Sequence, residues 1–167
     1  MKRLIGIVWL LAPLLSAHAY DALLVPLGNG ALLCGMARWF KAVAPSTKVI
    51  GICAATAPSM ANSWREQRVR PTPTANTIAD GIAVREPIAQ AVQDMHGIVD
   101  DVLLVSEANI VAAMRLCRQH AGLVLEPAGA VGLAALVAHE AQFAGQRVAT
   151  VLCGSNITAA QFAEYTR

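Results

Sequence analysis

Charged side chains are scarce in this chain of 167 residues: Asp, Glu, Lys and Arg together make up 14%. The formal net charge of +2 is too small to indicate a nucleic-acid or acidic-membrane partner, so we expect neither. Aromatic residues are also few, at 5%, whereas small and branched aliphatic residues dominate a hydrophobic fraction of 56%. That composition is typical of buried parallel strands under alanine-rich helices, or of a face left bare by a missing partner domain.

Metal-ligand patterns are absent from the sequence. The four cysteines lie far apart in apolar stretches and form no C-x-x-C pair, which argues against zinc: Cys34, Cys53, Cys117 and Cys153. We interpret them as buried free thiols, although four cysteines also allow two disulfides after export. The four histidines show no ligand spacing, and we therefore predict no metal site.

The first 19 residues have the layout of a secretory signal peptide. A basic start is followed by twelve apolar residues at 4–15 and by an A-x-A pattern at Ala17–Ala19. The apolar stretch is too short for an ordinary transmembrane helix, so no stable membrane span is expected. The alternatives are the beginning of a globular fold or a spurious start in a broken reading frame. We accordingly divide the chain into this segment, 1–19, and one domain, 20–167, which is exported or periplasmic if the signal is real.

Apolar runs alternate with helical periods along the rest of the chain. Strands are predicted at 22–27, 48–53, 101–106 and 147–154, and helices at 31–44, 59–67, 85–96, 107–122, 126–145 and 157–165. This alternation predicts an α/β fold with a mostly parallel sheet and helices on both faces. Ligands of such sheets bind at the carboxyl ends of the strands, where the sequences GNGAL, EPAGA and CGSN would meet.

A glycine-containing turn follows the first predicted strand and opens a helix. Such a turn presents several backbone N–H groups together and is suited to bind a phosphate. A Walker loop is excluded because the chain has no GK[ST]. A dinucleotide fingerprint is disfavoured because Leu33 stands at the third glycine position and the second strand ends at Cys53 rather than at an acid.

Four motifs, in order, resemble those of fold-type II pyridoxal-phosphate-dependent enzymes of the threonine dehydratase and serine racemase group. They are VPLGNGALLCG at 25–35, TIADGIAV at 77–84, EPAGAVGLAAL at 126–136 and VLCGSNI at 151–157. The resemblance implies the large-domain half of the tryptophan synthase β-like fold, with pyridoxal 5′-phosphate as the cofactor. It further implies an amino-acid substrate, β-elimination of ammonia from a hydroxy amino acid, and a cytoplasmic location.

The same resemblance assigns residues to the cofactor. The backbone of the turn corresponds to the phosphate loop, at Gly28, Asn29, Gly30, Ala31 and Leu32, with Asn29 and Ala31 in place of two usual glycines. Glu126 matches a glutamate that lines the cofactor cleft, although a helix-initial acid balancing the dipole is an equal alternative. Cys153 matches the Ser or Cys that faces the pyridine nitrogen. The metal-binding acids of some relatives are replaced here by Cys53 and Ser59.

The Schiff-base lysine of the family is missing from this sequence. The family carries it in an earlier S-x-K-x-R-G segment, whereas the lysines here are Lys2, Lys41 and Lys48. We therefore predict no catalytic residue and expect a C-terminal fragment that is inactive, or active only with a complementary N-terminal half. The expected partners are that half or further copies of the chain in a homo-oligomer. The alternatives are an exported, non-catalytic binding protein for a small phosphorylated ligand, and an unfolding-prone remnant with an uncovered apolar edge.

Overall fold

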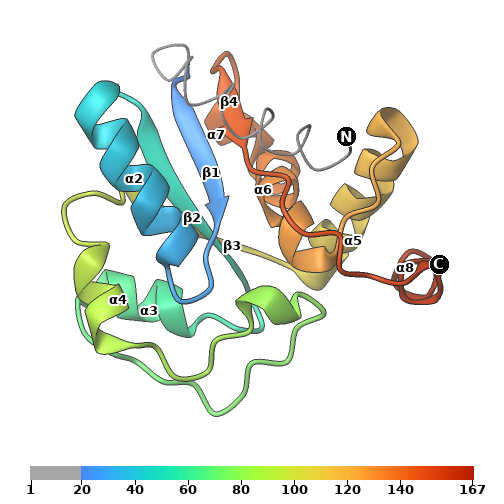
Figure 1. Cartoon of the computed structure of the whole chain (residues 1–167), viewed down its shortest axis with the longest axis horizontal. Helices are drawn as coiled ribbons and strands as arrows, with labels where there is room; N and C mark the ends of the chain where they lie inside the picture. Colours follow the sequence, from blue (N-terminus) through green and yellow to red (C-terminus); the bar gives the residue numbers. More distant parts are fainter. Residues whose placement is uncertain (1–19) are drawn as a thin grey trace, which may run out of the picture.

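A four-stranded parallel sheet forms the centre of the molecule, in a computed structural model that describes residues 20–167 (Figure 1). The strands are β1 (Ala22–Pro26), β2 (Lys48–Ala54), β3 (Asp101–Val105) and β4 (Val148–Thr150). Their order in the sheet is β3-β2-β1-β4, and all three neighbouring pairs are parallel. All four carboxyl ends therefore lie at one edge of the sheet, which we call the carboxyl edge. The predicted mostly parallel α/β sheet is confirmed.

Helices cover both faces of this sheet. They are α2 (Ala31–Val43), α3 (Ser59–Glu66), α4 (Ala89–Asp94), α5 (Glu107–Leu116), α6 (Pro127–Ala138), α7 (Glu140–Phe143) and α8 (Ala159–Tyr165), with a 3-10 turn η2 (Asp80–Ile82) and a π turn η3 (Cys117–Ala121). Helices α2, α3 and α4 pack on one face, and α5 and α6 on the other (Figure 1). The covering of both faces, which the doubly buried strands predict, is thus confirmed.

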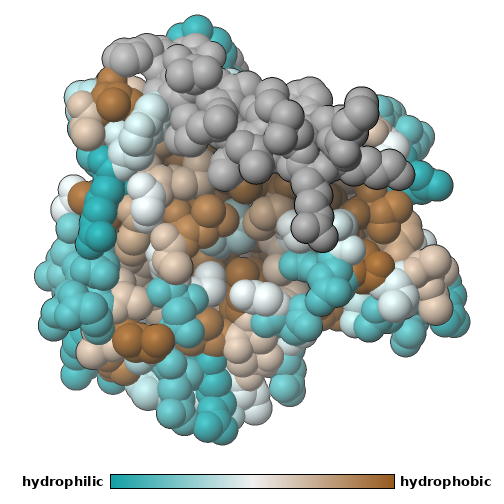
Figure 2. All heavy atoms as spheres, in the orientation of Figure 1, coloured by the Kyte–Doolittle hydropathy of each residue, from teal (hydrophilic) through white to brown (hydrophobic). Residues whose placement is uncertain are grey.

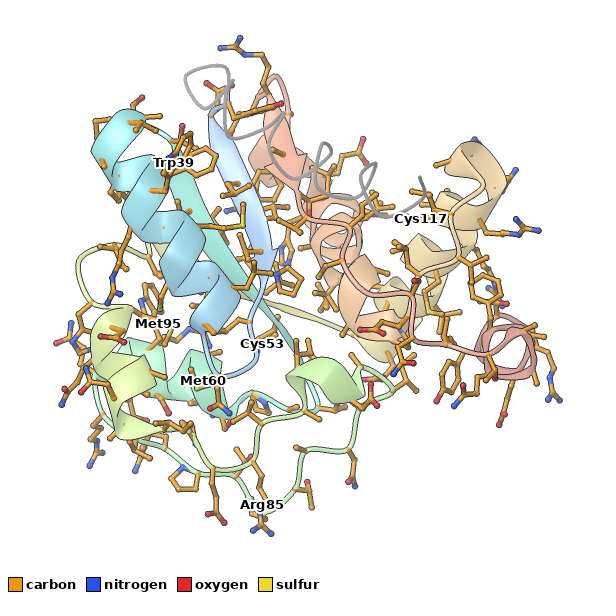
Figure 3. All side chains as sticks on the ribbon, viewed as in Figure 1. Trp39, Cys53, Met60, Arg85, Met95 and Cys117 are labelled. Atoms are coloured by element: carbon orange, nitrogen blue, oxygen red, sulfur yellow. The ribbon has the colours of Figure 1, made fainter. Side chains whose placement is uncertain are left out.

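Each strand contributes to two separate cores because successive side chains of a strand point to opposite faces. In β1, Leu24 packs among the residues of α5 and α6, whereas Leu23 and Val25 pack against α2. Cys53 and Cys117 belong to these opposite cores (Figure 3). In the view of Figure 2, hydrophilic residues border the left and lower margins and hydrophobic ones lie nearer the centre. All four cysteines are free, as predicted, and three of them are buried.

Several predicted elements are shorter than expected, three of them by several residues. The helix predicted at 85–96 begins only after Pro87, with Ile88 in an extended conformation as its N-cap. The helix predicted at 126–145 is divided into α6 and α7 at His139. The strand predicted at 147–154 ends at Thr150, because the chain beyond it turns to α6, where Gly154 O accepts a hydrogen bond from Glu126 N at 3.2 Å.

The signal-peptide and boundary predictions for 1–19 fall outside the described residues. Within residues 20–167, none of the helices has the length and apolar character needed to span a bilayer.

Candidate functional site

The glycine turn lies at the carboxyl edge, between β1 and α2. Gly30 is the N-cap of α2 and has a left-handed backbone, with φ 86° and ψ −4°. The first bond of the helix runs from Cys34 N to Gly30 O at 2.8 Å, and no acidic side chain lies in the first turn. In the described part of the chain, the N–H groups of Ala31, Leu32 and Leu33 donate no hydrogen bond. Unpaired donors at the positive end of a helix dipole form an anion-binding geometry.

The two replaced glycines of this turn cause no backbone strain. Among residues 20–167, the only non-glycine residue with a positive φ is Gln67, so Asn29 and Ala31 lie in ordinary conformations. Within the turn 28–32, only Gly30 has a left-handed backbone conformation, which glycine adopts without steric cost. Gly28 is needed for a different reason, because a Cβ there would lie 3.1 Å from the carbonyl oxygen of Gly81. The turn is therefore compatible with the residues that replace the usual glycines.

The segment containing η2 joins the glycine turn to the start of α6. Gly81 contacts Gly28 on one side, and on the other a Cβ at Gly81 would lie 3.1 Å from the Cβ of Ala128 and 3.7 Å from Glu126 Oε1. Asp80 stabilises this turn through its Oδ1, which accepts a hydrogen bond from Gly81 N at 2.9 Å. Three motifs that are far apart in the sequence thus meet at the carboxyl edge.

Glu107, at the start of α5, anchors the same segment and was missed by sequence reasoning. Its Oε1 accepts a hydrogen bond from the hydroxyl of Thr56 at 2.6 Å, and its Oε2 accepts one from Ile78 N at 2.9 Å. In the sequence, Glu107 looks like an ordinary acid at the start of a helix, where it stabilises the helix dipole. Nothing in the pattern therefore indicates that it also links Thr56 to Ile78.

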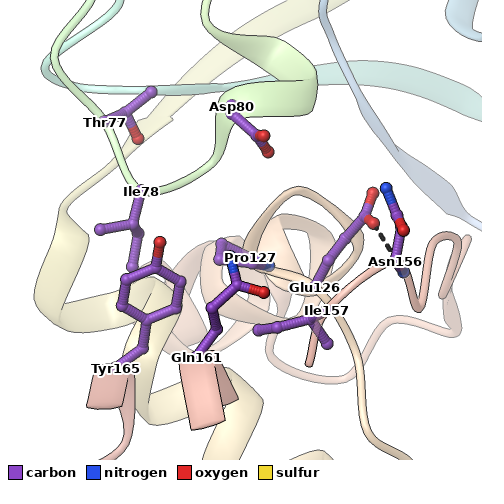
Figure 4. Close-up of a pocket in the computed structure, with 9 residues that line it drawn as sticks. All are labelled: Thr77, Ile78, Asp80, Glu126, Pro127, Asn156, Ile157, Gln161 and Tyr165. Atoms are coloured by element: carbon purple, nitrogen blue, oxygen red, sulfur yellow. Dashed lines mark hydrogen bonds between the residues drawn. The ribbon is translucent and has the colours of Figure 1, made fainter. Parts of the chain in front are cut away.

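Glu126 is the N-cap of α6, and its carboxylate binds the chain that follows β4. Its Oε2 accepts a hydrogen bond from Asn156 N at 3.0 Å (Figure 4). Gly154, with φ 79°, passes so close that a Cβ there would collide with the Glu126 carboxyl group. Glu126 makes no side-chain hydrogen bond to its own helix, so its observed role is to fix the segment 154–156.

Cys153 immediately precedes that segment and is half-buried. Its carbonyl lies against Gly129 of α6, at the place that a Cβ of residue 129 would occupy. Burial, and secondarily the negative charge of Glu126, raise the pKa of the Cys153 thiol above its ordinary value. The thiol is therefore neutral at physiological pH.

A cavity of about 120 Å³ opens beside Glu126 (Figure 4). It is lined by Thr77, Ile78, Asp80, Glu126, Pro127, Asn156, Ile157, Gln161 and Tyr165. Helix α8 contributes Gln161 and Tyr165 to its wall. Of the predicted site residues only Glu126 lines this cavity, whereas the glycine turn and Cys153 lie outside its lining.

Cys53 and Ser59, which stand where some family members have metal-binding acids, both donate hydrogen bonds to backbone carbonyl groups of the chain. The Cys53 thiol donates to Leu27 O at 3.6 Å, and burial raises its pKa to about 12. The hydroxyl of Ser59 donates to Val84 O. No group of three His, Cys, Asp or Glu residues suited to hold a metal ion occurs within residues 20–167.

The described lysines lie at the edge of the sheet opposite the glycine turn. Lys48 is the first residue of β2. Lys41, in the last turn of α2, forms an ion pair with Asp100, the residue before β3, with Nζ 2.7 Å from Oδ2. Neither ammonium group is placed near Glu126 or Gly30.

Comparison with known proteins identifies the class. The family model described as "Pyridoxal-phosphate dependent enzyme" matches residues 11–154, and the chain therefore belongs to this family. The resemblance inferred from the four motifs is confirmed, and with it the fold class and the family's cofactor, pyridoxal 5′-phosphate.

The relatives are ammonia-lyases, dehydratases and racemases of amino acids. The L-threonine ammonia-lyase of Geobacter sulfurreducens is 36% identical over 135 residues, which are 81% of this chain and 34% of that protein. The phenylserine dehydratase of Ralstonia pickettii is 35% identical over 90% of this chain and 46% of its own length. The crystal structure of a T.th. threonine deaminase has a TM-score of 0.79 at 33% identity, covering 83% of this chain and 51% of that one. The chain thus spans about a third to a half of the length of these relatives.

Proposed function

We propose that this chain is the phosphate-binding half of a pyridoxal-phosphate-dependent dehydratase that releases ammonia from a hydroxy amino acid by β-elimination. The observation that carries the proposal is the set of unpaired N–H groups at Ala31, Leu32 and Leu33, at the same edge as Glu126. When bound, pyridoxal phosphate supplies an electron sink for the carbanion formed at the substrate Cα.

Each residue of the site has a separate task in this proposal. The backbone of Gly28–Leu32 binds the phosphate dianion through N–H groups and the α2 dipole. The neutral thiol of Cys153 would serve as the partner of the pyridine nitrogen, and a neutral partner would leave that nitrogen unprotonated, which would favour β-elimination over transamination. Glu126 acts on the same group indirectly, because it fixes the segment 154–156 that follows Cys153.

The chain in isolation is proposed to be inactive. A lysine near the cofactor is needed both for covalent attachment and as the base at Cα, and Lys41 is held by Asp100 at the opposite edge. Pure chain is expected to release no ammonia from threonine or serine. Addition of a polypeptide carrying an S-x-K-x-R-G segment is expected to restore the reaction. Robust release of ammonia by the chain without that polypeptide would contradict the proposed inactivity.

Phosphate binding is tested separately from activity, with a substitution that preserves the helix. In Ala31→Asp, a carboxylate at the first position of α2 stabilises the helix through its dipole but repels a phosphate dianion at the same N–H groups. Binding of pyridoxal 5′-phosphate and of inorganic phosphate, followed by ³¹P NMR, is expected to weaken about tenfold or more, whereas Ala31→Asn binds nearly as the parent does.

The same titration distinguishes the proposal from its alternative. Equal binding by Ala31→Asp and the parent chain would place the phosphate elsewhere and overturn the assignment. Tight binding of inorganic phosphate without binding of pyridoxal phosphate would instead favour a non-catalytic protein for another small phosphorylated ligand. Borohydride reduction followed by mass spectrometry reports any attachment to lysine, so that adducts at exposed lysines are not counted as site binding.

A further inference from the structure

A second cavity, of about 300 Å³, lies at the amino end of β3, away from the carboxyl edge. It is bounded by the end of α3 and by the turn between α4 and β3, and its lining residues are Trp64, Arg65, Gln67, His96, Gly97 and Val99. The volume is at the lower end of the range that small-molecule sites occupy. Nothing in the proposed dehydratase function uses this cavity.

The lining of the cavity carries one formal positive charge, on Arg65, and no lining residue is acidic. By contrast, Arg68 and Arg70, a few residues along the chain, each form an ion pair with Glu66, at 2.9 and 2.7 Å. Within residues 20–167, no carboxylate forms an ion pair with Arg65. An anion is the ligand that this arrangement favours.

The guanidinium of Arg65 is held in place by a neutral backbone group. Its Nη2 donates a hydrogen bond to the carbonyl oxygen of Val102, in the edge strand β3, at 2.8 Å. This bond orients the group without cancelling its charge, and leaves its other N–H donors for a ligand. Orientation in advance lowers the entropic cost of binding an anion.

The rest of the lining adds one donor and an apolar wall. The N–H of Gly97, which has φ 73°, donates no hydrogen bond within the described chain. The half-buried indole of Trp64 and the buried side chain of Val99 supply flat and aliphatic surface. A purely inorganic anion would leave that surface in water, whereas a carboxylate with an apolar body would cover it.

We propose that this cavity binds a small carboxylate with an apolar or aromatic body. The carboxylate accepts hydrogen bonds from the Arg65 guanidinium, an N–H of the His96 ring and the Gly97 backbone. The body lies against Trp64 and Val99. The site is independent of pyridoxal phosphate and of the assignment of the glycine turn.

The probe for this site is benzoate, with benzamide as an uncharged compound of the same shape. Titration of the ¹⁵N-labelled full chain is expected to shift the Gly97 amide and the Trp64 indole resonances saturably with benzoate. Benzamide is expected to bind about tenfold or more weakly, because it lacks the charge that Arg65 recognises. Equal binding of the two compounds, or no saturable shift at high benzoate concentration, would overturn the proposal.

Variants test which side chains carry the binding. Arg65→Gln is expected to weaken benzoate binding about tenfold, whereas Arg68→Gln, which removes a neighbouring cation outside the cavity, leaves it unchanged. Because Arg65→Gln also removes the bond to Val102, His96→Gln serves as a second variant that leaves that bond intact, with an expected severalfold loss. Retained affinity in both variants, or equal loss in Arg68→Gln, would contradict the assignment.

Discussion

The carboxylate of Glu126 accepts a hydrogen bond from the backbone N–H of Asn156 at 3.0 Å, so the residue that opens α6 holds the chain that follows β4. Cys153 lies three residues before Asn156, and the Glu126 charge adds to burial in raising the pKa of its thiol. One carboxylate therefore both holds the chain next to Cys153 and adds to the burial that keeps its thiol protonated.

Glu126→Gln is expected to lower the pKa of the Cys153 thiol. The amide oxygen still accepts a hydrogen bond from Asn156 N, but the negative charge that disfavours the thiolate is gone. At a given mildly alkaline pH, more of the thiol is ionised, so alkylation of Cys153 by iodoacetamide is faster in the variant. Mass spectrometry of the Cys153 peptide across pH measures this change. Glu140→Gln, on exposed α7, serves as the control, and an unchanged titration midpoint in Glu126→Gln would contradict the charge coupling.

Alanine at two helical glycines is expected to have opposite effects on stability. In Gly129→Ala, the new methyl group meets the carbonyl of Cys153, and the backbone must move, at a cost of about 1–3 kcal/mol in the free energy of unfolding. In Gly35→Ala, on the exposed side of α2, the methyl group meets nothing within 4 Å, and the helix gains about 0.5–1 kcal/mol. Urea unfolding of both variants measures the difference. Equal effects would show that Gly129 does not set the approach of the two segments.

Removal of Asp100 is expected to cost more than removal of Lys41. Asp100 Oδ2 accepts hydrogen bonds from Lys41 Nζ at 2.7 Å and from Val49 N at 2.6 Å, so Asp100→Ala removes both, at about 1–3 kcal/mol. Lys41→Met keeps the bond to Val49 and removes a partly exposed ion pair and the bond from Lys41 Nζ to Thr47 O at 3.2 Å, at about 1 kcal/mol. Denaturant unfolding gives both values, and added salt is expected to shrink the ion-pair contribution to both, leaving the Val49 bond as the part of the Asp100 effect that salt changes least. A larger cost for Lys41→Met would reverse this assignment.

Cys53 is expected to make the folded state sensitive to alkaline pH. Burial raises its pKa from an ordinary 9.0 to about 12, so an unfolded chain loses this thiol proton at a pH where the folded chain still holds it. The stability that this thiol contributes is fully present below pH 9.0 and is lost progressively as pH rises toward about 12. Thermal unfolding from neutral to alkaline pH is expected to show a smaller decline in Cys53→Ala than in the parent. Parallel declines would mean that Cys53 ionises equally in both states.

Sequence reasoning located the elements of this fold with small errors. Doubly apolar runs predicted the four strands because parallel strands are buried on both faces, as Leu23 and Leu24 show by packing into opposite cores. The last strand was predicted too long, since the apolar residues Val151 and Leu152 look like strand residues. Their departure from the sheet accompanies the hydrogen bond from Glu126 N to Gly154 O, a contact between distant residues that has no periodic signal in the sequence.

The sequence predicted which motifs form the candidate site, but not the contacts between their residues. The convergence of the glycine turn and the start of α6 follows from parallel topology, which the pattern predicts. The contact of Gly81 with Gly28, and the bridge from Glu107 to Ile78, join residues whose distance in space has no periodic signal. Arg65 reads as one charge of a solvated run, because nothing in the sequence distinguishes an arginine held by a carbonyl from one paired with Glu66.

The strand order has a consequence for synthesis on the ribosome. β1 is made first among the described strands yet occupies an interior position, with β2 on one side and β4 on the other. The bond from the Thr150 hydroxyl to Leu24 O spans 126 positions of the chain. While β2 can join β1 early, the other side of β1 stays unpaired until β4, more than a hundred residues later, has been made. Until then an apolar strand has an open edge, and this interval is when the nascent chain is most exposed to wrong pairing.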